Sequence, residues 1–218
     1  MRLQLALATT LALATCTLDA RAQSAAPTPA LSTEEAALLS LIDSAIRTHP
    51  ALHGSVRWSF GSGDQEQNDH GHLSIDERAL SLRTGDNAVF FADAEHVAMF
   101  DPLPAPGSFL RRAMRTPMTD YAAIVHEETS TSSLFIPRIL AHTASSADVE
   151  LLPRTRWTMV ERIVARVNLG NTPGRIERVL TFDGLGGHFR IDLLSLAPAR
   201  HPLALSEPEH AGAHVIDF

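Results

Sequence analysis

The chain has 218 residues and a mass of 23.6 kDa, with 44% hydrophobic and 20% charged residues, a balance typical of a folded globular protein. Its net charge of -7 and pI near 5.8 disfavour nucleic acid and anionic membrane surfaces as partners, because both need a basic field. The 18 basic residues are all arginines, and they are scattered along the sequence.

The N-terminus predicts export. A short basic start precedes an apolar core at residues 3–15, and Ala20-Arg21-Ala22 offers the small residues that a signal peptidase reads. The core is too short to anchor the chain in a bilayer. We therefore expect a signal peptide at 1–22 and a mature protein in the periplasm, with a Pro-containing linker at 23–31.

Cys16 leaves an alternative open. Residues 13–16 resemble a lipobox, in which Cys16 would be lipidated and anchor the mature protein, although Thr15 is unusual there. Cys16 is also the sole cysteine. Cleavage after Ala22 would leave no thiol, which excludes disulfides, cysteine nucleophiles and thiolate metal sites.

An amphipathic helix is predicted directly after the linker. Ser32 and Glu35 have the spacing of a capping box, and apolar residues recur at helical spacing up to His49-Pro50. Alternating apolar residues then predict short strands near 56–60, 73–75, 80–82, 89–91 and 97–100, joined by turn residues.

The middle of the chain has a different pattern. Residues 108 to about 142 are interpreted as helix and loop, because Phe109, Leu110, Ala113 and Met114 have helical spacing and Pro117 interrupts them. Strand patterns return at 149–152, 163–169, 175–182 and 188–193, and the tail from Pro198 has little pattern. The whole predicts a mainly β (α+β) fold, a curved antiparallel sheet covered by helices, as one domain over 32–218.

Residues with catalytic chemistry do not form a recognisable pattern, so we expect no enzyme and no cofactor. No Gly-x-Ser-x-Gly or phosphate-binding loop occurs. The pairs His70/His72 and His210/His214 suggest metal ligands, but neither has a third ligand nearby in sequence, so we predict no metal site.

The apolar side of the strands is the candidate site. One parity of the early strands is apolar, and the later strands add similar residues. These residues either form an ordinary core or line a cavity for acyl chains. The predicted lipid-binding residues are Val56, Trp58, Phe60, Leu73, Ile75, Leu80, Leu82, Phe91, Met99, Ile163, Val167, Phe189 and Ile191.

In order and spacing, several segments resemble the LolA family of periplasmic lipoprotein carriers. Residues 53–60 are similar to the family's first strand, and Gly71-His72-Leu73-Ser74-Ile75 resembles its Gly-x-Leu-x-Val segment. Residues 93–102 resemble its Asp-Gly-x-x-x-Trp-x-Tyr-x-Pro hairpin, although Ala98 or Met99 and Phe100 replace the Trp and Tyr. Residues 149–153 and 212–217 resemble later segments.

This resemblance implies an unclosed β-barrel covered by helices, which takes lipoprotein acyl chains or a related lipid from an inner-membrane release complex to an outer-membrane receptor. Such carriers hold their helical lid with an Arg-Pro after the second strand. Here the pair is Glu77-Arg78, so Arg78 is the candidate lid-holding residue, one residue out of register. We expect a monomeric carrier. The alternative is a periplasmic sensor or adaptor of the same fold that regulates a membrane partner.

Overall fold

The computed structural model describes residues 31–217 apart from 63–64, 104–106, 114–115, 117, 155–159, 184, 202, 204 and 210–211. The predicted signal peptide, Cys16, most of the linker and His210 lie outside these residues. The helices are α2 (Thr33–Thr48), α3 (Met118–Val125) and α4 (Thr131–Leu134). None of the helices in the described part of the chain is both long and apolar enough to cross a membrane.

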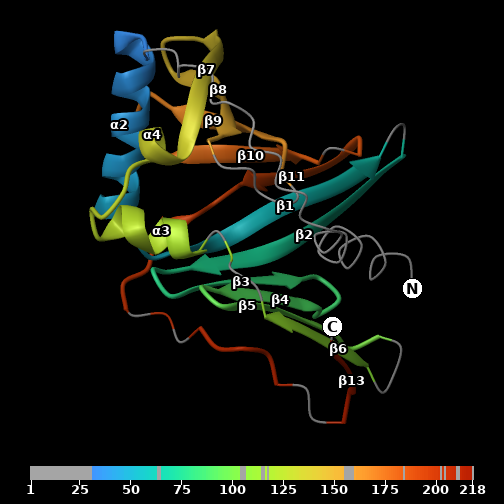
Figure 1. The fold of residues 1–218 in the computed structure, drawn as a ribbon. Coiled ribbons are helices and arrows are strands. Elements are labelled where there is room, and N and C mark those ends of the chain that lie inside the picture. The colour runs from blue at the N-terminus through green and yellow to red at the C-terminus, as the bar shows by residue number, and fades with distance from the viewer. Residues whose placement is uncertain are drawn as a thin grey trace, which may run out of the picture.

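The strands form one large sheet (Figure 1). Their order is β13-β6-β5-β4-β3-β2-β1-β11-β10-β9-β8-β7, and β12 also pairs with β1. The neighbours are antiparallel except β13 and β6, which are parallel. The strands are β1 (Leu52–Ser62), β2 (Gln65–Ile75), β3 (Ala79–Thr84), β4 (Val89–Asp93), β5 (His96–Asp101), β6 (Ser108–Ala113), β7 (Phe135–His142), β8 (Ser146–Pro153), β9 (Arg162–Asn168), β10 (Ile176–Phe182), β11 (Gly187–Leu193), β12 (Ala197–Pro198) and β13 (His214–Asp217).

The sheet is curved and does not close, as the sequence predicted. Within the described residues, β7 and β13 are the two edges and do not pair with each other. The helices lie on one side of the sheet, with α2 beside β7 to β9 and α3 beside β3 and β4 (Figure 1). The predicted fold class, a mainly β curved antiparallel sheet forming an unclosed barrel with helices over it, is confirmed.

The predicted helix after the linker is also confirmed. The Ser32 hydroxyl accepts a hydrogen bond from the Glu35 backbone N–H at 3.2 Å, and the Glu35 carboxylate accepts one from the Ser32 N–H at 2.9 Å. This capping box satisfies two N–H groups that have no partner within the helix. Leu38, Leu39 and Ile42 form the buried stripe of α2, and the helix ends before His49 as predicted.

The helix-and-loop interpretation of residues 108–142 is wrong at both ends. Residues 108–113 form strand β6, in which the neighbouring Phe109 and Leu110 are both buried. Burial on both faces removes the alternation that marks a strand and imitates helical spacing. Residues 135–142 form β7 despite Pro137, which an edge strand tolerates because one side of its backbone needs no partner in the sheet.

The C-terminal tail has more structure than its sequence suggested. It runs along the outside of β3 to β6 and ends in β13, which pairs with β6 (Figure 1). Leu205 and Ala213 pack against Phe91, Phe109 and their neighbours. Glu207 contacts His96 at 3.0 Å and Arg111 at 3.2 Å. The tail therefore covers the side of the sheet that faces away from the helices.

Candidate functional site

Side chains directly opposite each other on antiparallel strands point to the same face of a sheet, so the register defines two faces. We call the face on which α2 and α3 pack the inner face. Trp58 on β1 is opposite Ile191 on β11, which is opposite Val179 on β10, which is opposite Ala165 on β9. In the other direction, Leu73 on β2 continues this face to β3 through β6.

The inner face is mainly apolar. Among the residues of β1 to β11 whose side chains the structure describes, its polar members are Asp69, Thr84, Asp101, Ser108, Arg112, His142 and Thr181, together with the indole N–H of Trp58. The apolar residues include Val56, Phe60, Ile75, Leu80, Leu82, Phe90, Ala92, Val97, Met99, Leu110, Ile139, Val149, Leu151, Ile163, Val167, Phe189 and Leu193. Eleven strands, β1 to β11, thus contribute apolar side chains to the same face of the sheet.

The helices fill two parts of this surface. Leu39 of α2 packs on β7, β8 and β9, where Val149 and Val167 are completely buried. Met118 of α3 packs against Ala92 of β4 and Val97 of β5. In both clusters buried apolar side chains of a helix pack against buried apolar side chains of the sheet, as in a protein core.

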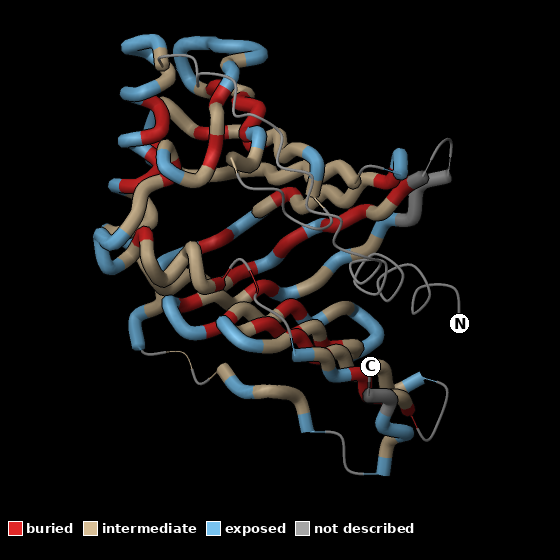
Figure 2. The backbone as a smooth tube through the Cα atoms, in the orientation of Figure 1, coloured by how far each residue is buried: buried red, intermediate tan, exposed pale blue. Residues whose placement is uncertain are grey.

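Strands β10 and β11 lie between these two parts and are less covered. Val179 and Thr181 on β10 are half-buried, and so are Phe189, Ile191 and Leu193 on β11. Figure 2 shows both strands largely in the colour of intermediate burial. Large apolar side chains that stay partly exposed between two helix-covered parts of a curved sheet are the feature that would admit an apolar ligand.

The structure brings most of the predicted lipid-binding residues together. Twelve of the thirteen lie on the inner face: Val56, Trp58, Phe60, Leu73, Ile75, Leu80, Leu82, Met99, Ile163, Val167, Phe189 and Ile191. Phe91 is the exception, because it is opposite Ser81 and Ala98 on the outer face and packs with Phe109. Its neighbour Phe90 takes the inner position. Phe90 and Phe91 are both apolar, so only the register shows which one faces inward.

Arg78, the candidate lid-holding residue, makes its side-chain hydrogen bonds to groups outside the helices. Its guanidinium donates to the Asp76 carboxylate and to the Leu203 carbonyl, each at 2.9 Å, and it therefore fastens the C-terminal tail outside the sheet. The Asp76 carboxylate raises the pKa of Arg78 above its usual range, mainly through this hydrogen bond.

Other residues, which the sequence analysis missed, connect the helices. Arg47 of α2 donates to the Ile124 carbonyl of α3 at 3.0 Å and to the Thr129 carbonyl at 3.4 Å. Asp43 of α2 is buried and accepts from the Thr131 backbone N–H of α4 at 3.0 Å. These bonds join α2 to α3 and α4 as one unit. Nothing in the pattern of charges marks them, because their partners are backbone groups far away in sequence.

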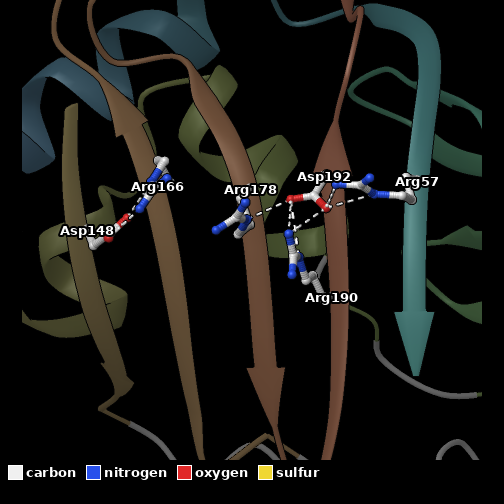
Figure 3. Close-up of polar contacts among 6 residues, drawn as sticks. All are labelled: Arg57, Asp148, Arg166, Arg178, Arg190 and Asp192. Atoms are coloured by element: carbon white, nitrogen blue, oxygen red, sulfur yellow. Dashed lines mark hydrogen bonds and ion pairs between the residues drawn. The ribbon is translucent and has the colours of Figure 1, made fainter. Parts of the chain in front are cut away.

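A network of charges occupies the outer face of the same strands (Figure 3). Asp192 of β11 accepts hydrogen bonds from Arg57 of β1 at 3.1 Å, Arg178 of β10 at 2.6 Å and Arg190 at 3.1 Å. Arg166 of β9 forms a bidentate pair with Asp148 of β8 at 2.7 Å. The network ties together β1, β11 and β10, which the helices do not cover.

The arginines control the ionisation of the two acids. Burial by itself would raise the pKa of Asp192, but the hydrogen bonds from Arg178, Arg190 and Arg57 outweigh burial and lower this pKa to about 2. The hydrogen bond from Arg166 likewise lowers the pKa of Asp148. Both carboxylates therefore stay ionised at neutral pH, and their role is to stabilise the sheet.

The histidines do not gather into a ligand set. His70 and His72 lie on the outer face of β2, opposite Arg57 and Ser55. The ring of His72 lies 6.3 Å from that of His53. Within the described ranges, no group of three His, Cys, Asp or Glu side chains is placed to hold a metal ion.

Comparisons with known proteins give structural similarity only. No family model matches the sequence, and no curated protein matches it. Among solved structures, the chain is similar to a LolA superfamily protein from Nitrosomonas europaea, with 11% identity, a TM-score of 0.42, and coverage of 79% of this chain and 96% of that one. It is also similar to a DUF1329 family protein from Desulfovibrio piger, with 12% identity, a TM-score of 0.42, and coverage of 78% and 94%.

A third similar structure is the MucA/MucB complex of Pseudomonas aeruginosa, with 11% identity and a TM-score of 0.39. That match covers 83% of this chain and 62% of the other, so this chain spans about three fifths of its length. The resemblance to LolA proteins noted in the sequence is therefore found again among solved structures, at low identity.

Proposed function

We propose that this protein is a periplasmic carrier that binds acyl chains of lipoproteins or a related lipid on the inner face of its sheet and delivers them toward the outer membrane. The partial exposure of the inner-face residues of β10 and β11, between two helix-covered clusters, carries this proposal. An acyl chain placed there gains about 0.8 kcal/mol for each buried methylene.

No chemical step is part of the proposed function. The inner face supplies no activated nucleophile among the described residues, and its polar groups are spread over several strands. An inner-membrane release complex and an outer-membrane receptor are the expected partners, by resemblance to LolA proteins. The predicted signal peptide supports the periplasmic location.

The test is mass spectrometry of lipid extracted from natively purified protein, with a matched pair of variants. Ile191→Asp places a carboxylate on the half-buried inner face of β11, whereas Leu180→Asp places one on the half-buried outer face of neighbouring β10. We expect stoichiometric lipid in the wild type and in Leu180→Asp, and little in Ile191→Asp, because a charge is costly in an apolar site.

Equal lipid content in the two variants, with circular dichroism showing both folded, would contradict binding on the inner face. If the wild type carries no lipid and takes up no fluorescent fatty-acid probe, the carrier proposal fails. In that case, a sensor or adaptor that binds a membrane partner would be the better explanation.

A further inference from the structure

The indole N–H of Trp58 is a buried donor without a hydrogen-bond partner. Trp58 is 1% exposed, and its Nε1 has no acceptor within reach. Buried tryptophan N–H groups usually have one, since leaving such a donor unpaired is unfavourable. The buried residues packed with Trp58, which are Val56, Leu73, Leu82 and Leu196, are apolar. Asp69 lies opposite Trp58 on β2 but does not accept a hydrogen bond from the indole.

The covering over Trp58 on the β11 side is thin. The ring of Phe189 lies 6.1 Å from that of Trp58, centroid to centroid, and Phe189 is itself only half-buried. Ile191, directly opposite Trp58 on β11, is half-buried as well. A rotation of the Phe189 side chain would therefore bring a ligand on the inner face against the indole.

Polar side chains on the inner face of the central strands are confined to one end. Asp69 is opposite Trp58, Thr84 is opposite Gly71, and Thr181 is opposite Phe189. The other end of the same strands, toward α3, carries only apolar groups among the described residues: Leu52, Ile75, Leu80, Ala92, Val97 and Leu193. The inner face is therefore directional, with Trp58 where the apolar part meets the polar part.

We infer that Trp58 Nε1 donates a hydrogen bond to the carbonyl oxygen of an acyl ester or amide, with the acyl chain running from Trp58 toward α3. This inference rests on the proposed function and narrows it to one ligand class and one orientation. It makes Trp58 a specificity-determining residue, because a pure hydrocarbon would leave the donor unpaired.

The charge of Asp69 decides between a neutral carbonyl and a free fatty acid. A fatty-acid carboxylate bound at Trp58 would lie on the strand pair that carries the Asp69 carboxylate, and like charges repel. An arginine on the same face could neutralise such a carboxylate. Within the described part of the inner face this arginine is Arg112 on β6, which lies several strands away from Trp58. A neutral ester or amide is not repelled by Asp69 and needs no arginine to neutralise it.

The orientation can be measured by bromine quenching of tryptophan fluorescence. The chain has two tryptophans, so Trp157→Phe leaves Trp58 as the sole fluorophore. Methyl 2-bromododecanoate and methyl 12-bromododecanoate have the same composition and differ in the position of bromine. We expect the first to quench Trp58 several-fold more strongly at saturation. Equal quenching, or stronger quenching by the second, would overturn the inference.

The ligand class can be measured with methyl dodecanoate, dodecanoate and dodecane, added to wild type and to Trp58→Phe, which keeps an aromatic ring and removes the donor. Trp58→Phe should weaken binding of the ester about tenfold and leave dodecane nearly unchanged. Tighter binding of dodecanoate than of the ester, or an unchanged ester affinity in a folded variant, would contradict the inference alone. If none of the three binds to the wild type, the proposed function fails as well.

Discussion

Strands β8 and β9 and their neighbours β10 and β11 all have apolar residues at alternate positions, but the burial of these residues differs. On β8 and β9, the inner-face residues Val149, Ala165 and Val167 are buried under α2. On β10 and β11, Val179 and Ile191 are half-buried, and the contacts that hold the strands are the charged bonds of Asp192 on the outer face.

The difference shows that the apolar residues of a sheet face do not determine by themselves whether a helix packs on them. Where α2 packs, inner-face burial stabilises the fold. Where no helix packs, the sheet is held by backbone pairing and by the outer network, which leaves the inner face available. The stabilising charges and the proposed ligand-binding surface thus lie on opposite faces of the same two strands.

The largest expected effect concerns the helix that fills the covered part. Leu39→Ala should lower the free energy of unfolding by about 2–5 kcal/mol, because Leu39 is 1% exposed and its truncation leaves a cavity. Leu41→Ala on the same helix is the control, since Leu41 is 38% exposed and its loss should cost under about 1 kcal/mol. Urea unfolding measures both. Equal losses would mean that α2 is not packed as described.

Two valines test the difference in burial between the inner faces of β9 and β10. Val167→Ala on β9 should cost about 2 kcal/mol, since two fully buried methyl groups are removed. Val179→Ala on β10 should cost under about 1 kcal/mol, because that side chain is already partly in water. Thermal and urea unfolding of delipidated protein would decide. A similar cost at both positions would break the distinction between the two strand pairs.

The outer network predicts a dependence on pH. The pKa of Asp192 is lowered from 3.8 to about 2 in the folded protein, so its contribution is complete above about pH 5 and disappears as the pH falls through 2. This contribution is at most about 2 kcal/mol and is reduced by solvent screening of the partly exposed arginines.

Asp192→Asn should therefore flatten the fall in stability between pH 5 and pH 2, measured by urea unfolding at each pH. Asp183→Asn, in the loop between β10 and β11, is the control for removing one carboxylate. An unchanged pH profile in Asp192→Asn would show that the three arginines do not stabilise its charge.

A small effect on stability is expected from the hydrogen bonds between the helices. Arg47→Ala should cost about 1 kcal/mol and increase amide hydrogen exchange in α3, because the α3 carbonyl of Ile124 loses its donor. Arg78→Ala should leave exchange in α3 unchanged and affect the C-terminal tail instead. The opposite result would restore Arg78 as the residue that holds the helices.

The sequence alone was enough for the elements that have a clear local pattern. The capping box at Ser32 and Glu35 and the stop at His49-Pro50 predicted α2, because these signals act within a few residues of each other. Alternation predicted the inner face of β1, β9 and β11, since side chains on a strand point to alternate faces. It failed for β6, where the C-terminal tail buries the outer face and Phe109 and Leu110 are both apolar.

What only the tertiary structure decided is which parts of the apolar face are covered and what connects the helices. Twelve candidate residues share the inner face, but Val167 is fully buried under α2 whereas Ile191 is half-buried, and both have the same local pattern. Contacts with other strands, with the C-terminal tail or with another helix determine the surroundings of Phe91, Arg78, Arg47 and Trp58. The physical reason is that periodicity fixes the direction of a side chain, whereas burial and pairing depend on which distant segment packs against it.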